Sequence, residues 1–267
     1  MVDPSRGVLY PTRLPSFTRI GPPARVADLV GWFWIPEWDL PPGRSSRQHL
    51  VAYPSCNLVV EADGVGLAGP STRISHRDLT GRGWAVGALL RPAAVATLTE
   101  DPGSLRDAYA PVRAPDLHTA VCAAMSGSDQ ADRHRAAVEA YSDWLVERVG
   151  LATAEARLAN EMAGLLMTDS SVLRLDDAAQ ALAVSSRTLQ RLARRYVGVS
   201  PTAIIRRRRL QEAAQVIRDD PHPDLSAIAA DLGYADHAHL TNDFAAVLAF
   251  TPSAYRATIR SDENSFR

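Results

Sequence analysis

The chain has 267 residues, of which 46% are hydrophobic and 22% charged, and its formal net charge is −1. This composition excludes a wholly disordered chain, and no apolar run is long enough for a membrane span. Two cysteines are too few for a disulfide scaffold or a cysteine-based zinc site. We therefore expect a cytoplasmic globular protein of one large domain or two ordinary ones.

Residues 1–115 have the pattern of a β-rich domain. Short apolar runs are bounded by turn-forming or polar residues at 30–35, 50–53, 57–61, 65–69 and 84–90. Between two of these runs, Asp63-Gly64 predicts a hairpin connection. A series of short strands with Gly and Pro in the turns is typical of a barrel or a sandwich. A short helix is then expected from Pro92 to Glu100, with proline at its first position.

From Asp116 onward the pattern is helical. Leu117, Val121 and Met125 recur at a spacing of four residues, and apolar faces are also present at 130–149 and 154–167. We interpret residues 116–170 as a helical linker that also contacts a second copy of the chain. The polar segment 168–171 is the predicted boundary of the next domain.

Residues 171–267 contain two similar units. Each has a short apolar helix, a tight turn, a Ser or Asp that can cap the next helix, and a second amphipathic helix. The caps are Ser185 in the first unit and Asp236 in the second. One such unit alone could be an ordinary helical hairpin, but two in succession favour a pair of helix-turn-helix units.

A connecting helix is expected between the two units. It begins at Ser200-Pro201 and runs to about Arg218, a rod of roughly 27 Å at about 1.5 Å per residue. Such a rod can present the two second helices to adjacent major grooves, which lie roughly 34 Å apart. Residues 178–211 hold eight arginines and no acidic residue. This placement favours a surface that faces DNA phosphates over a merely solvated face.

Four motifs then appear in a fixed order: Gly198-x-Ser200-Pro201, Ile228-Ala229, Leu232-Gly233-Tyr234 and Thr251-Pro252-Ser253-x-Tyr255-Arg256. With them, residues 172–260 resemble the DNA-binding domain of the AraC/XylS family of transcription regulators. The resemblance implies a sequence-specific regulator whose partners are duplex DNA, a second copy of itself as a homodimer, and a small-molecule effector.

The same resemblance implies a base-reading face on each second helix. In the first unit this face comprises Ser186, Arg187, Gln190 and Arg191, and in the second unit His237, Ala238, Thr241 and Asn242. Arginine can bind guanine and glutamine can bind adenine through paired hydrogen bonds. We add Arg194, Arg195 and Arg206 as phosphate contacts. Four consecutive arginines cannot share one face of a helix, so some of the run 206–209 must pack or pair. Arg207 and Arg208 therefore either meet phosphate or belong to a solvated face, and we expect a structural role for Arg209. Because the second helix lacks arginine and carries Asp243, the first unit is expected to supply most of the affinity.

Residues 53–58 and 87–92 more weakly resemble β-barrel sensor domains that precede such DNA-binding domains. An effector pocket is implied there, for which Trp32, Trp34 and Trp84 are candidates, although such residues are more often core. The predicted fold is therefore α+β: a β-barrel-like domain at 1–115, a helical linker at 116–170, and an all-α domain with two helix-turn-helix units at 171–267.

An alternative function is a DNA-binding protein with an N-terminal cupin-like enzyme or an alkyl-transfer activity. The enzyme needs several histidines around one metal, but only His49 and His76 lie in the β-rich part. The alkyl-transfer protein needs a reactive cysteine or a four-cysteine zinc site, and we expect Cys56 to be a buried, inert thiol. A purely architectural DNA-binding protein would not need the β-rich domain. We therefore expect no enzymatic activity, no metal and no cofactor.

Overall fold

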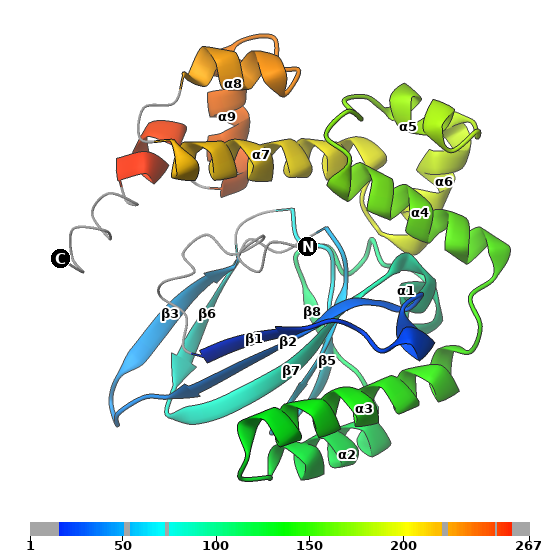
Figure 1. Cartoon of the computed structure of the whole chain (residues 1–267), viewed down its shortest axis with the longest axis vertical. Helices are drawn as coiled ribbons and strands as arrows, with labels where there is room; N and C mark the ends of the chain where they lie inside the picture. Colours follow the sequence, from blue (N-terminus) through cyan, green and yellow to red (C-terminus); the bar gives the residue numbers. More distant parts are fainter. Residues whose placement is uncertain (1–15, 51–53, 73–74, 221–223, 249, 258–267) are drawn as a thin grey trace.

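The computed structural model describes residues 16–50, 54–72, 75–220, 224–248 and 250–257 (Figure 1). An antiparallel sheet with two helices against it forms one part of the molecule, and the C-terminal helices form the other. Of the strand predicted at 50–53, residues 51–53 lie outside the described ranges. Among the described helices, none combines the length and hydropathy needed to cross a membrane.

The predicted β-rich domain is confirmed as an antiparallel sheet. Six strands pair in the order β1 (Ser16–Ile20), β2 (Val30–Asp39), β7 (Arg82–Leu90), β4 (Asn57–Glu61), β5 (Gly64–Ala68) and β8 (Tyr109–Pro111). A separate two-stranded ribbon joins β3 (Ser45–Leu50) to β6 (Ser75–Thr80). The expected hairpin is present, because Glu61 pairs with Gly64 across the turn. The sequence did not reveal β6, since it carries a single apolar residue in six.

Register places the candidate effector tryptophans on two different faces of this sheet. Trp34 pairs with Gly87, whereas Trp84 pairs with Glu37. Residues directly opposite each other in an antiparallel pair share a face, and successive residues alternate. Trp84 therefore lies on the side of Glu37, which contacts His134 of the overlying helix. Trp32 and Trp34 lie on the other side, so the three do not line one pocket.

Helix α1 (Pro92–Leu98) lies between β7 and β8 in the sequence. Three helices follow β8: α2 (Pro115–Met125), α3 (Gln130–Val149) and α4 (Ala154–Thr168). Helices α2 and α3 pack on the sheet rather than extending away from it. Phe33 of β2 meets Tyr141 of α3 edge to face, and the Tyr141 hydroxyl donates to the Leu58 carbonyl at 2.6 Å. Helix α4 then leads from this layer to the C-terminal helices (Figure 1).

The two predicted helix-turn-helix units are present at the two ends of one long helix (Figure 1). The first unit is α5 (Leu175–Ala181) and α6 (Ser186–Tyr196), and the second is α8 (Leu225–Asp231) and α9 (His237–Leu248). They are joined by α7 (Pro201–Asp219), which has 19 residues. The predicted caps are confirmed: Ser185 accepts from the Thr188 amide, and Asp236 accepts from the His239 amide at 2.7 Å.

The hydrophobic core consists of two clusters, and the boundary between them lies within α7. Apolar residues from the sheet through Ile205 form one continuous buried cluster, and those from Leu210 to Tyr255 form another. The turn at Gly198 reinforces the first cluster. Its φ is +85°, and a Cβ there would lie 2.5 Å from the carbonyl carbon of Pro102. The first helix-turn-helix unit is therefore built onto the N-terminal domain, whereas the second has a core of its own.

Candidate nucleic-acid interface

Helix α6 presents a polar row to solvent. Arg187, Gln190, Arg191 and Arg194 are exposed at positions i, i+3, i+4 and i+7. On a helix this spacing places side chains on one face. Leu189, Leu192, Ala193 and Tyr196 are buried on the opposite face. The structure thus brings together the long polar side chains that the sequence assigned to the first base-reading face.

Ser186 lies beside this row but has a different environment. It is half-buried, and its hydroxyl donates to Asp176 Oδ1 at 2.7 Å. This bond ties the start of α6 to α5, so Ser186 holds the two helices of the unit together.

Glu155, at the start of α4, pairs with two of the predicted DNA contacts. It accepts hydrogen bonds from Arg191 Nη1 and, at 2.8 Å, from Arg195 Nη1. The Tyr196 hydroxyl also donates to it, at 3.1 Å. The hydrogen bond from Arg191 is the main cause of the lowered pKa of Glu155. This contact could not be predicted from the sequence, because Glu155 precedes the two arginines by 36 and 40 residues.

The second unit has a different surface chemistry. His237 and Asn242 are exposed on α9 and Thr241 is half-buried. Asp243 is not an isolated negative charge. It forms a two-point ion pair with Arg206 of α7, with N–O distances of 2.6 and 2.8 Å. In this structure Arg206, a predicted phosphate contact, is directed to α9.

The rest of the arginine run on α7 points inward. Arg207 and Arg208 are 4% and 1% exposed. The prediction that these two side chains meet DNA phosphates is therefore wrong. Their guanidinium groups are packed inside the protein. This agrees with the expectation that some members of a run of four arginines must pack, since the run occupies several faces of a helix.

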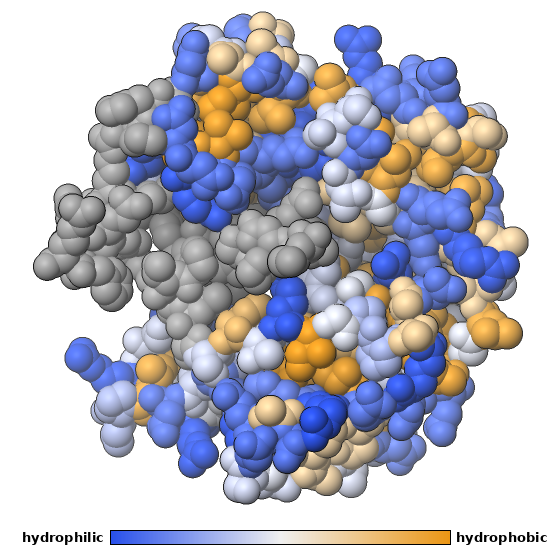
Figure 2. Space-filling view, in the orientation of Figure 1, coloured by the Kyte–Doolittle hydropathy of each residue, from blue (hydrophilic) through white to orange (hydrophobic). Residues whose placement is uncertain are grey.

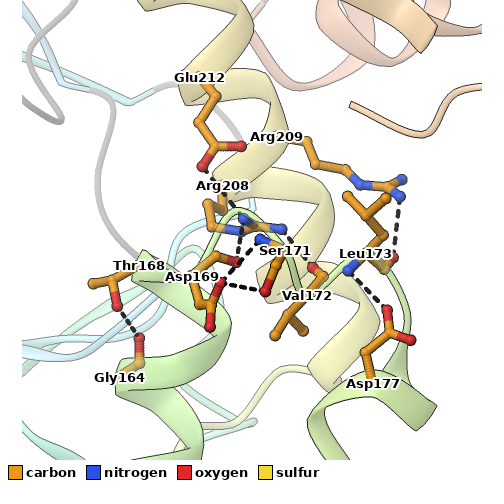
Figure 3. A network of polar contacts seen from close by, with 10 residues as sticks. All are labelled: Gly164, Thr168, Asp169, Ser171, Val172, Leu173, Asp177, Arg208, Arg209 and Glu212. Carbon is orange, nitrogen blue, oxygen red and sulfur yellow. Dashed lines mark hydrogen bonds and ion pairs between the residues drawn. The ribbon is translucent and has the colours of Figure 1, made fainter. Parts of the chain in front are cut away.

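Arg208 and Arg209 instead clamp the segment between α4 and α5 onto α7 (Figure 3). Arg208 donates to the carbonyl oxygens of Asp169 and Val172, and Arg209 donates to that of Leu173 at 3.0 Å. The Arg209 guanidinium also lies 5.3 Å from the ring centroid of Tyr234. The expected structural role of Arg209 is confirmed by these contacts.

The remaining candidates of the N-terminal domain have ordinary environments. Cys56 is buried, and burial raises the pKa of its thiol to about 12, as expected for an inert cysteine. In the part of the chain that the structure describes, no three His, Cys, Asp or Glu side chains are grouped so as to hold a metal ion. The face shown in Figure 2 carries several small apolar groups among hydrophilic residues.

Two helix-turn-helix units joined by one helix, with an arginine-rich row on the first recognition helix, define a DNA-binding regulator. Residues 178–258 match the family described as a helix-turn-helix domain, and residues 18–110 match a domain of unknown function, DUF6597. The chain is a DNA-binding transcription regulator with an AraC-type helix-turn-helix domain at its C-terminal end.

Several solved structures are similar to the chain. An apo ToxT variant with one substitution, from Vibrio cholerae strain SCE256, is 12% identical, with 85% of this chain and 97% of that chain covered and a TM-score of 0.43. Unsaturated fatty acid bound ToxT from the same strain is 12% identical, with coverage of 84% and 94% and a TM-score of 0.40. The AraC-like transcriptional activator CuxR is 17% identical, with coverage of 74% and 94% and a TM-score of 0.22. No curated protein matches the chain.

Proposed function

We propose that the exposed face of α6 reads DNA sequence in the major groove and that this reading directs the chain to its operator. The observation that carries the proposal is the row of Arg187, Gln190, Arg191 and Arg194 at helical spacing on a solvent-facing surface. Arginine supplies two parallel donors for guanine, and glutamine pairs with adenine. Arg194 and Arg195, at the end of the helix, contact phosphates.

Helix α9 makes the second, weaker contact. This helix presents His237, Thr241 and Asn242 and has no arginine or lysine, so it adds little of the electrostatic attraction that dominates binding to DNA. The only cation that lies against α9 in the ion pairs described, Arg206, is neutralised by Asp243. Affinity is therefore concentrated in the first unit, and the second unit adds base-specific hydrogen bonds such as Asn242 to adenine.

DNA binding competes with a contact inside the protein. Arg191 and Arg195 are held by Glu155 in the structure, so a duplex must displace that carboxylate to engage both side chains. Since α4 belongs to the core shared by the sheet and the first unit, any change that moves α4 also changes the availability of the recognition helix. This is a physical route by which the N-terminal domain controls DNA binding.

We further propose that two copies of the chain act together and that the N-terminal domain performs no catalytic step. The support for a second copy is an apolar surface where α3 meets α4: Val146 is 39% exposed and Leu151 is 98% exposed. Dimerisation would make binding of the second half-site an intramolecular event. Sedimentation of the full chain with and without operator measures the number of subunits.

The test of the base-reading face compares three alanine variants on one selected duplex at one salt concentration. Arg191→Ala is expected to weaken binding by about 1–3 kcal/mol and to relax preference at one base pair. Asn242→Ala is expected to cost less. Arg44→Ala, which removes an exposed arginine from the β2–β3 turn, is the matched control. A uniform loss on all sequences would make Arg191 a phosphate contact, and a larger loss at Asn242 would refute the unequal roles of the two units.

A further inference from the structure

Two consecutive carboxylates near the start of α5 have different tasks. Asp177 caps the helix, because its carboxylate accepts from the backbone amides of Leu173 and Arg174 at 2.9 and 2.7 Å. Asp176 is exposed, and its Oδ1 accepts a hydrogen bond from the Ser186 hydroxyl of α6 at 2.7 Å. A negative charge beside a recognition helix opposes the approach of phosphates. Asp176 therefore has a cost for DNA binding that its neighbour's capping role does not explain.

Two consecutive serines at the start of α6 also have different tasks. The Ser185 hydroxyl accepts from the Thr188 amide at 3.1 Å and caps the helix. Ser186 is the first residue of α6 and lies four residues before Gln190, so these two side chains share a face. Residues at the start of a recognition helix contact base edges. Ser186 therefore lies at the edge of the base-reading face.

The hydrogen bond to Asp176 determines which hydrogen-bonding groups Ser186 has left for DNA. A serine hydroxyl has one hydrogen and two lone pairs. An ionised carboxylate only accepts hydrogen bonds, so the hydrogen of Ser186 is directed to Asp176. Turning this hydrogen toward DNA would break a charge-assisted hydrogen bond, which is stronger than one between neutral groups. In this arrangement Ser186 offers DNA an acceptor and no donor.

We propose that Asp176 sets the base specificity of Ser186 and that Ser186 selects an amino base. The inference rests on the proposed function, which is the reading of DNA by α6. In the major groove, adenine and cytosine present an amino group that donates, whereas guanine and thymine present oxygen acceptors. Ser186 as an acceptor binds the amino group and meets only lone pairs on the keto oxygen. Asp176 is thus a positioning residue, which acts on DNA through the orientation of one hydroxyl.

The second unit lacks this arrangement. When the two units are aligned by sequence, Ser226 stands in the place of Asp176, and His237 stands in the place of Ser186. Among the contacts of the described residues, no hydrogen bond joins Ser226 to His237. A carboxylate that orients a base-reading side chain therefore belongs to the first unit, the unit that also carries the arginines.

The experiment begins by locating the base pair that Ser186 faces. Binding sites for the full chain are selected from a library of randomised duplexes, and the selection is repeated with Ser186→Ala. The position at which this variant loses the preference of the native chain is the position that Ser186 reads.

Base analogues then identify the atom that Ser186 contacts. At this base pair, the amino base is replaced by an analogue without the exocyclic amino group, and separately the keto base by one without the oxygen. Loss of the amino group is expected to weaken binding of the native chain about three- to tenfold, the contribution of one hydrogen bond. Loss of the keto oxygen is expected to leave binding unchanged. Any effect that persists in Ser186→Ala comes from the duplex itself and is subtracted.

Asp176→Ala tests the positioning role. Without its acceptor the Ser186 hydroxyl can turn and donate to a keto base, so the preference between the two orientations of this base pair is expected to fall below about twofold. Preferences at other positions are expected to remain, and affinity for all sequences is expected to rise because a negative charge is removed. Asp231→Ala is the control, since it removes an exposed carboxylate at the end of α8 and should leave every preference unchanged. In a Ser186→Ala background, Asp176→Ala should not alter the preference at this position.

Four results overturn the proposal. They are a Ser186→Ala variant that keeps every preference, a greater loss from the keto oxygen than from the amino group, an Asp176→Ala variant with the native preference, and one that loses preference at every position. The second result needs no change at Asp176, so it decides the question even if Asp176→Ala does not fold. Failure of the proposed function is distinct, because Arg187→Ala and Arg191→Ala would then keep the native preference at every position.

If those two variants alter the preference and any of the four results is obtained, α6 reads DNA without the help of Asp176.

Discussion

Replacement of Glu155 by glutamine tests whether α4 restrains the recognition helix. The substitution keeps the size of the side chain and removes the charge that Arg191 and Arg195 share. Both arginines then remain on α6 and become available to DNA. We therefore expect Glu155→Gln to bind its operator more tightly than the native chain does.

The size of the effect follows from the exposure of the pairs. The Glu155 side chain is 31% exposed, and those of Arg191 and Arg195 are 56% and 60% exposed. Ion pairs of this kind contribute about 0.2–1 kcal/mol each. Two of them give about 0.4–2 kcal/mol, or a gain of about two- to thirty-fold in affinity. The gain shrinks as salt is added, because screening weakens the pairs in the native chain.

The assay is a fluorescence-anisotropy titration of one labelled duplex at two salt concentrations. Glu161→Gln is the matched control, since it removes an exposed carboxylate from the same helix and Glu161 has no ion pair with α6 among those described. If Glu155→Gln gains no more affinity than Glu161→Gln, or if it binds more weakly, the restraint by α4 is refuted.

Three further predictions concern stability. Arg208→Gln leaves the carbonyls of Asp169 and Val172 without their donor, and is expected to lower the unfolding temperature by several degrees without changing the salt dependence of DNA binding. A fragment of residues 172–260 is expected to unfold at a lower temperature than one of 151–260, because α4 covers the first unit; equal values would contradict the shared core. Burial by itself raises the pKa of Glu37, but hydrogen bonds from Gln130, Arg133 and His134 lower it below 4.5. The hydrogen bonds to the ionised Glu37 carboxylate therefore stabilise the folded state above pH 4.5, and this contribution is lost as the pH falls through the pKa of Glu37 in the folded protein. Between pH 5 and 3, the free energy of unfolding of Glu37→Gln should therefore fall less than that of the native chain.

The helices of this protein could be predicted closely because their signals are local. Proline or a capping side chain marks the start of α1, α6 and α7, and helical periodicity marks the buried faces. These effects act within a few residues along the chain. The strands β3 and β6 were harder to predict. They form a ribbon outside the main sheet, and their sequences have little of the alternation of apolar and polar residues that marks a strand with one buried face.

Pairing between distant charges could not be predicted from the sequence. A run of four arginines on α7 suggested a phosphate-binding surface, yet Arg207 and Arg208 are buried and Arg206 is paired with Asp243. Arg208 contacts Glu212 on its own helix, but the other hydrogen-bond partners of Arg206 and Arg208 come from segments more than thirty residues away. Placement of a long, flexible side chain depends on which elements pack beside it, which is a property of the assembled fold.

The sequence by itself determined that this chain carries two helix-turn-helix units and which of them holds the arginines, since both follow from local periodicity and composition. Only the tertiary structure decided which arginines are available to DNA. Packing of α4 against α6 places Glu155 within hydrogen-bonding distance of Arg191 and Arg195. Packing of the sheet domain against α7 encloses the Arg207 guanidinium. The sequence shows which side chains are charged. Their exposure to solvent and their ion-pair partners depend on which surfaces the packing of the apolar cores brings together.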